Sequence, residues 1–360
     1  MFKPSVRVLP TTLILIAAWG MLSFAPKCVS AQSSDSVYKK NNSDGGNSTA
    51  RGKIISTSKD GVTVRTKSNS EEMVPAQNIR RIGVAGESSL INRARERMLS
   101  GRYDDCLSEL AKITDTPDSE LIQTEIAFMK SSCQANKSLR GENVTAQQAG
   151  SAIRNFVQTY PDSFHFYPAT HLLGQLFVAI GKPELAEKEF AKLSQSQWPS
   201  MRIKGFFEQG NALLLTGDLE GAKTCFSNIG KLDVNDDEAQ QFKLVAQCQL
   251  AKIMALEGKS EAGRAIVEKI IKEENPDNGM LFAYAYNTLG TCHVQSQQPK
   301  PAAIAFLHTE LLYGTESDPH AEALYNLAKL WPQLEETDRA NRARQALKSR
   351  YRNTYWALQL

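Results

Sequence analysis

Hydrophobic residues follow two different spacings along the chain. They alternate with polar residues in the segment 51–86, whereas from Ser88 onward they recur about every 3.6 positions. Alternation is the period of a β-strand, and 3.6 residues is the period of an α-helix. The pattern therefore predicts a mainly α protein, in which a small β module at residues 51–86 precedes a helical domain at residues 88–360.

Two β-branched runs in the first part of the module predict a hairpin. They cover residues 53–58 and 62–66, and Asp60-Gly61 lies between them. Asp-Gly favours a tight turn, because Gly takes the positive φ that such a turn needs.

Further strands are expected at Met73-Val74 and at residues 79–82. So short a segment has little core of its own. We therefore expect an SH3-like curled sheet that leans on the first helices. A simple three-stranded flap without a binding role is the alternative.

The helical part repeats one pattern at intervals of 36, 41, 39 and 38 residues. A small residue is followed seven positions later by Gly, then after five by Ala, and after four by Phe. The copies are Gly174, Gly181, Ala186 and Phe190; Gly210, Gly217, Ala222 and Phe226; Ala251, Gly258, Gly263 and Val267; Gly290, Gln297, Ala302 and Phe306; and the degraded Ala328, Glu335, Ala340 and Arg344.

At these residues the chain resembles the tetratricopeptide repeat, over about residues 90 to 360. In that pattern the small residue and the Ala lie where two helices cross, the Gly ends the first helix in the left-handed conformation, and the last residue fills the gap between neighbouring units. The resemblance implies a right-handed α-solenoid of antiparallel helix pairs that binds partners on its concave face. Tyr160-Pro-Asp-Ser163 before a helix also resembles repeat proteins of the bacterial cell envelope.

The same register predicts a partner-binding groove on the first helices of the pairs. Its predicted residues are His171, Gln175, Phe207, Asn211, Lys252, Tyr284, Asn287, Tyr325 and Lys329. Amides can pair with a peptide backbone and aromatic rings can hold side chains, so the groove suits an extended peptide. The alternative is that these residues are merely exposed. The two Asn and two Lys match only part of the clamp that binds C-terminal carboxylates.

The first 31 residues are typical of an export signal. Residues 1–7 are basic, residues 13–24 are apolar, and small residues stand at positions −3 and −1 before Gln32. We therefore predict a signal peptide at residues 1–31 and a periplasmic or secreted protein. A retained membrane anchor is the alternative, although the apolar run is short for a span of about 20 residues.

Residues 32–50 contain almost nothing apolar and are rich in Ser, Asn and Gly. Such a composition cannot offset the entropy lost on ordering, so a disordered leader is expected.

Charge argues against nucleic acid as a partner. The chain carries a net charge of +3, and residues 1–31 account for it through Lys3, Arg7 and Lys27. The remainder is neutral and has no overall field to hold a polyanion.

The C-terminal stretch is nevertheless basic, with Arg339, Arg342, Arg344, Lys348, Arg350 and Arg352. A polar outer face is what the end of a solenoid needs. The alternative is contact with an anionic headgroup or an acidic protein, hence a membrane-associated partner. Tyr351, Tyr355 and Trp356 either pack the last helix down or mark a contact surface.

Five cysteines remain beyond the signal: Cys106, Cys133, Cys225, Cys248 and Cys292. They are expected to be small buried hydrophobic residues. Disulfides Cys225–Cys248 or Cys106–Cys133 are the alternative that an exported protein allows.

The chain shows no motif for chemistry. It has no HExxH, no GxSxG and no Gly-rich phosphate loop, and its acid pairs fall in loops or helix ends. We therefore predict no enzyme, no catalytic residue, no metal and no cofactor.

The function expected is that of an exported scaffold for a protein or peptide, with its oligomeric state left open. An accessory subunit, or an unrecognised hydrolase acting on envelope polymers, is the alternative. Acids or histidines clustered in a pocket would favour it.

Overall fold

The structure is a computed structural model, and it describes residues 34–40, 46–234 and 236–360. The predicted signal peptide at residues 1–31 lies outside these residues. Among them no helix combines the length and the apolarity that crossing a membrane requires.

Five antiparallel strands form one sheet in the order β4-β3-β2-β1-β5. They are β1 (Asp35–Lys40), β2 (Asn47–Ser58), β3 (Gly61–Arg65), β4 (Glu71–Pro75) and β5 (Ile79–Gly83), with the short 3-10 helix η1 (Ala76–Asn78) before β5.

The expected disordered leader is wrong for much of residues 32–50, because β1 and the start of β2 lie there. β1 pairs with both β2 and β5. Its Val37 is fully buried, and the carboxylate of Asp35 accepts hydrogen bonds of 2.7 Å from the backbone N–H groups of Ile54 and Ala85. One buried side chain and two strand partners thus order a segment whose composition is polar.

The predicted hairpin is present, but its glycine acts differently from the expectation. Ser58 pairs with Gly61, and the residues between them form the turn. Gly61 is not among the residues with positive φ. It is needed because a Cβ there would lie 2.3 Å from the carbonyl oxygen of Val74 on β4.

The sheet shares its core with the first helices, as expected. Val62, Val64 and Ile82 form one buried cluster with Ile91 and Cys106. The sheet also touches a later part of the chain, because the indole Nε1 of Trp198 donates to the carbonyl oxygen of Asp60 at 2.7 Å.

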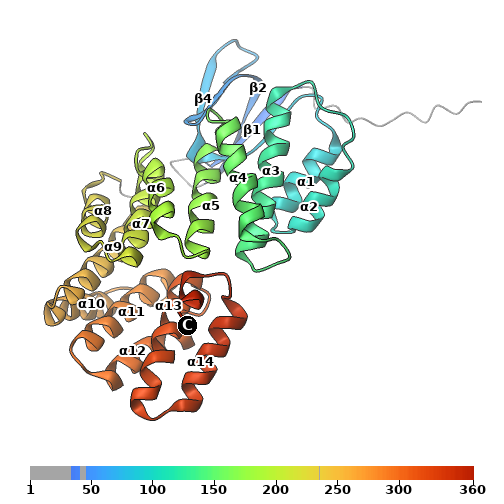
Figure 1. Cartoon of the computed structure of the whole chain (residues 1–360). Coiled ribbons are helices and arrows are strands. Elements are labelled where there is room, and N and C mark those ends of the chain that lie inside the picture. Colours follow the sequence, from blue (N-terminus) through green and yellow to red (C-terminus); the bar gives the residue numbers. More distant parts are fainter. Residues whose placement is uncertain (1–33, 41–45, 235) are drawn as a thin grey trace, which may run out of the picture. The chain divides into compact units, whose positions relative to one another are not determined.

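Fifteen α-helices follow within the described residues, and fourteen of them form seven consecutive pairs (Figure 1). The pairs are α1 (Ser89–Leu99) with α2 (Tyr103–Ala111), α3 (Glu120–Leu139) with α4 (Ala146–Thr159), α5 (Phe166–Ala179) with α6 (Pro183–Ser194), α7 (Pro199–Thr216) with α8 (Leu219–Lys231), α9 (Asp237–Leu256) with α10 (Ser260–Glu273), α11 (Gly279–Gln295) with α12 (Pro299–Leu312), and α13 (Ser317–Leu330) with α14 (Thr337–Arg350). The 3-10 helix η2 (Trp331–Leu334) extends α13, and α15 (Tyr355–Leu358) ends the chain.

The turn inside each pair contains one residue with positive φ. These residues are Gly101, Gly141, Gly181, Gly217, Gly258, Gln297 and Glu335. The last five are the positions that the repeat pattern predicted to end the first helix. Two of them are not glycine and still take the left-handed conformation.

The small residue and the aromatic residue of the pattern meet within one pair. A Cβ added at Gly174 would lie 2.4 Å from the ring of Phe190, and one at Gly210 would lie 2.7 Å from the ring of Phe226. The expectation that the aromatic residue bridges neighbouring pairs is therefore incomplete, since its ring lies on the small residue of its own pair. The close approach explains why position 174 must be small.

Candidate functional site

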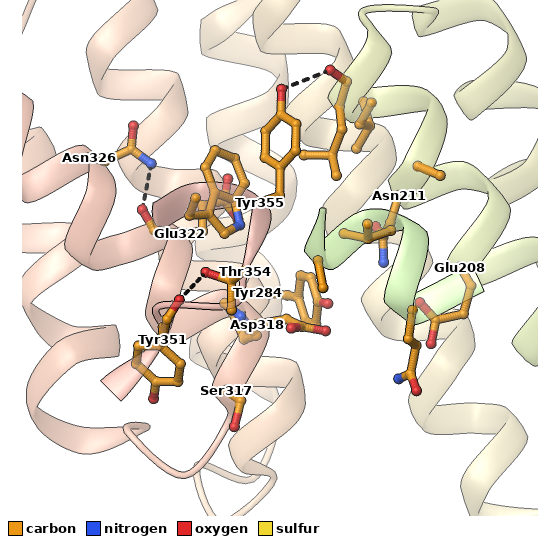
Figure 2. A pocket seen from close by; sticks show the side chains of 18 of the residues that line it. Glu208, Asn211, Tyr284, Ser317, Asp318, Glu322, Asn326, Tyr351, Thr354 and Tyr355 are labelled. Carbon is orange, nitrogen blue, oxygen red and sulfur yellow. Dashed lines mark hydrogen bonds between the residues drawn. The ribbon is translucent and has the colours of Figure 1, made fainter. Parts of the chain in front are cut away.

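One cavity of about 970 Å³ lies where the first helices of five pairs meet the C-terminal segment (Figure 2). Polar side chains that line it from the helices include Gln175 on α5, Glu208 and Asn211 on α7, Gln249 and Lys252 on α9, Tyr284 on α11, and Asp318, Glu322 and Asn326 on α13.

Hydrogen bonding links the first helices of neighbouring pairs along the lining of the cavity. Gln249 Nε2 donates to Asn211 Oδ1 at 2.6 Å, and the Asn211 side chain lies next to the hydroxyl of Tyr284. Burial raises the pKa of Tyr284 well above its usual value, and nearby carboxylates add to the effect. Tyr284 therefore stays protonated and serves as a fixed polar group.

Two of the three carboxylates in the cavity have partners. Glu208 Oε1 is 2.9 Å from His171 Nε2, and Glu322 pairs with Lys252 and accepts from Asn287 Nδ2 at 3.2 Å. Burial alone would raise the pKa of Glu208, but the hydrogen bond to His171 and the charges of His171 and Lys204 together outweigh burial, and the pKa lies below its usual value.

Asp318 is the exception among these carboxylates. Its side chain is open to the cavity, and it has neither a hydrogen bond nor an ion pair with the described residues. Desolvation by the cavity wall and the nearby carboxylates of Glu208 and Glu322 raise the pKa of Asp318 to about 6, although part of the residue stays exposed.

The C-terminal segment forms one wall of the cavity. Asn353 Nδ2 donates to the carbonyl oxygen of Ser138 at 2.8 Å, and the Tyr355 hydroxyl donates to that of Leu215 at 3.2 Å. The ring of Trp356 packs 5.2 Å from that of Tyr325 on α13. The segment after α14 is thus held against the second, fourth and seventh pairs.

Four of the nine residues predicted for the groove line this cavity, namely Gln175, Asn211, Lys252 and Tyr284. His171 and Asn287 do not line the cavity themselves. They hydrogen-bond two residues that do, Glu208 and Glu322 respectively. The structure places the other three elsewhere. Phe207 is a core residue only 4% exposed, Tyr325 packs against Trp356, and Lys329 is exposed next to Tyr325.

Phe207 and Tyr325 stand three residues before the small residue of the repeat, whereas the positions two residues before it face the cavity at Glu208, Gln249 and Asn326. Lys329 follows the small residue directly, as Gln175, Asn211 and Lys252 do in earlier pairs, but it lies outside the lining. One residue turns a helix face by about 100°. That rotation puts Phe207 in the core and the neighbouring Glu208 in the cavity.

The structure does not support the partial likeness to a carboxylate clamp. Lys252 is already paired with Glu322, and Asn287 donates to Glu322 and to the carbonyl oxygen of Pro319. These donors are committed to groups of the protein itself.

The five cysteines of the described residues are buried free thiols. The expectation of small buried residues is confirmed, and neither suggested disulfide is formed. Among the described residues no three His, Cys, Asp or Glu side chains lie close enough to hold a metal ion.

The helix pairs, their turns and their crossings define a tetratricopeptide-repeat-like fold preceded by a small antiparallel β sheet. A solved structure of this class is similar: a tetratricopeptide repeat protein from Parabacteroides merdae, with a TM-score of 0.54 and 14% identity over 72% of this chain and 91% of that chain.

A second similar structure is the apo form of the quorum sensor NprR from B. thuringiensis, with a TM-score of 0.49 and 14% identity over 72% of this chain and 74% of that chain. No protein-family model and no curated protein matches the sequence. Identities this low show the fold and leave function to the site.

Proposed function

We propose that this chain is an exported, non-catalytic binding protein that holds a segment of a peptide or protein partner in the cavity. The observation that carries the proposal is the cavity itself, with polar groups from five successive inner helices on one continuous lining. Its volume of about 970 Å³ accommodates a few residues of a peptide. Export is supported by the basic, apolar and small-residue order of residues 1–31.

The test begins with peptides selected from a random displayed library on residues 32–360. Their affinity is then measured by fluorescence anisotropy for the wild type and for Gln175→Trp, which adds bulk to the lining on α5. We expect an affinity loss of at least about tenfold, because the indole fills part of the cavity. Lys188→Trp, at an exposed site on α6, is the matched control and should bind like the wild type.

The proposal is wrong if the selected peptides bind both Trp variants equally well, because they would then lie outside the cavity. It is equally wrong if the library yields no binder.

The clustered acids favour a second candidate, a hydrolase acting on envelope polymers. Asp318 has a raised pKa and Glu208 a lowered one, and a pair separated in this way suits an acid and a base in glycoside hydrolysis. Glu208 is, however, bonded to His171 and Glu322 to Lys252, so neither is free as a base or nucleophile. Release of dye from labelled peptidoglycan that disappears in Asp318→Asn would establish the hydrolase and exclude the non-catalytic proposal.

A further inference from the structure

Three carboxylates surround one point of the cavity. Glu208 comes from α7, Asp318 and Glu322 come from α13, and all three act on the pKa of Tyr284 between them. Figure 2 shows Tyr284 and Asp318 in the middle, with Glu208 on one side and Glu322 on the other. This part of the lining therefore carries negative charge from two pairs that are distant in the chain.

Two of the three carboxylates are engaged by basic side chains. Lys252 pairs with Glu322 and His171 bonds Glu208, which leaves Asp318 without a partner among the described residues. Asp318 is thus the carboxylate with which a positively charged bound group would pair.

Three arginines also line the cavity, namely Arg140, Arg350 and Arg352. Arg140 donates to the carbonyl oxygen of Gly101 at 2.9 Å and Arg350 to that of Gly314 at 3.3 Å, whereas Arg352 has no hydrogen bond or ion pair with the described residues. None of the three acts on the pKa of Asp318, which responds to burial and to the carboxylates of Glu208 and Glu322. They belong to the wall of the cavity and do not supply a counter-ion for Asp318.

A second and independent observation points to a ligand that donates hydrogen bonds. Gln249 lines the cavity and is only 3% exposed, yet its Oε1 has no hydrogen-bond partner. Asn287, which contacts Glu322, is 1% exposed and its Oδ1 is likewise unpaired. A buried acceptor without a partner costs about 1–3 kcal/mol, so a donor from a bound group that reached it would stabilise the complex.

The spacing of the acids selects the kind of cation. In the part of the chain that the structure describes, no three acidic, His or Cys side chains converge on one metal ion. Acceptors spread around a cavity instead suit an organic cation that carries several N–H groups pointing in different directions.

We propose that this region binds the ammonium or guanidinium group of a Lys or Arg side chain of the peptide partner, with Asp318 as its counter-ion. The proposal rests on the proposed function, because the basic side chain is part of the peptide in the cavity. The unpaired oxygen of Gln249 accepts from the same group or from the adjoining peptide. The ligand class is therefore a basic peptide.

The experiment uses three labelled pools of random nonapeptides whose central residue is Arg, citrulline or Glu. Citrulline keeps the shape of Arg and removes its charge. We expect residues 32–360 to bind the Arg pool about tenfold more tightly than the citrulline pool, and the Glu pool most weakly. Asp318→Asn should remove the preference for Arg and leave the affinity for citrulline unchanged.

Asp338→Asn is the matched control, since Asp338 occupies the first turn of α14 as Asp318 occupies that of α13, but does not line the cavity. It should keep the preference for Arg. Equal binding of the Arg and citrulline pools, or an Arg preference that persists in Asp318→Asn, overturns the inference. If Gln175→Trp still weakens binding in that case, the peptide site stands and only its preference for a basic residue is wrong. If no pool binds, both proposals are wrong.

Discussion

Asp318 is a carboxylate whose nearest charged neighbours in the cavity are other carboxylates. Its pKa of about 6 means that the folded protein binds this proton more tightly than the unfolded chain, where an Asp titrates near about 4. A raised pKa of an acid destabilises the folded state above that pKa and has no effect below the unfolded value. The free energy of unfolding thus loses a contribution as the pH rises from about 4 to about 6.

We therefore expect Asp318→Asn to unfold at a higher temperature than the wild type at pH 7.5, and at the same temperature at pH 3.5. Thermal unfolding followed by circular dichroism over this pH range provides the measurement. Comparing the two proteins at each pH removes the contribution of Glu125, whose pKa is lowered and which does not act on Asp318.

The control variant Asp338→Asn should unfold at the same temperature as the wild type at pH 7.5. Identical unfolding curves for Asp318→Asn and the wild type at every pH would mean that the neighbouring acids do not act on Asp318.

The site was only partly predictable from the sequence. Of the residues predicted one position after the small residue of the repeat, Gln175, Asn211 and Lys252 line the cavity. Glu208 and Gln249 were missed, although a polar residue two positions before the small residue in several copies was a usable signal. Asp318 could not be found in this way, because it stands in the first turn of α13 and outside the repeated pattern.

At the scale of helices and strands, the turn inside each pair is the feature that the sequence predicted best. A glycine seven positions after a small residue is a local signal, and the left-handed conformation was present even at Gln297 and Glu335. The opposite case is β1. Its order depends on pairing with β2 and β5, which lie elsewhere in the chain, and its own composition gave no sign of a strand.

The turn at Gln297 gives a prediction for stability. A residue with a Cβ is strained at its φ of 58°, by about 1 kcal/mol or more. Gln297→Gly should therefore raise the free energy of unfolding by about 1 kcal/mol, as measured by urea denaturation.

The reverse change, Gly217→Ala, introduces the strain at a φ of 83°, where a Cβ meets no neighbouring atom. This substitution should lower the free energy of unfolding by about 1 kcal/mol. If the free energy of unfolding changed in the same direction in both variants, this account of the turns would be contradicted.

At the scale of the whole molecule, the C-terminal segment adds contacts that a simple repeat array lacks. Repeats normally contact only their neighbours in the chain, so their ends open independently. Here Asn353 bonds to Ser138 and Tyr355 to Leu215, across 215 and 140 residues. The seventh pair is thus coupled to the second and the fourth.

Removal of residues 351–360 should uncouple the seventh pair from the second and the fourth. Each hydrogen bond lost is worth about 1 kcal/mol, and the packing of Trp356 on Tyr325 is lost as well. We expect amide hydrogen exchange to become faster in α13 and α14 by at least about tenfold, while α5 and α6 change less.

Removal of the exposed residues 359 and 360 alone is the control and should leave exchange unchanged. Unaltered protection of α13 after the longer truncation would show that the segment contributes nothing to coupling.

The wall formed by the C-terminal segment also sets an order of events during synthesis. Residues 351–358 leave the ribosome after the seven helix pairs, so the earlier pairs have had time to fold before them. A nascent chain that already contains α13 has its acidic side chains in place, but nothing yet covers that side of them. The cavity is therefore closed on this side only after the seventh pair has been made, and a chain stopped before residue 350 would present Asp318 on an open surface.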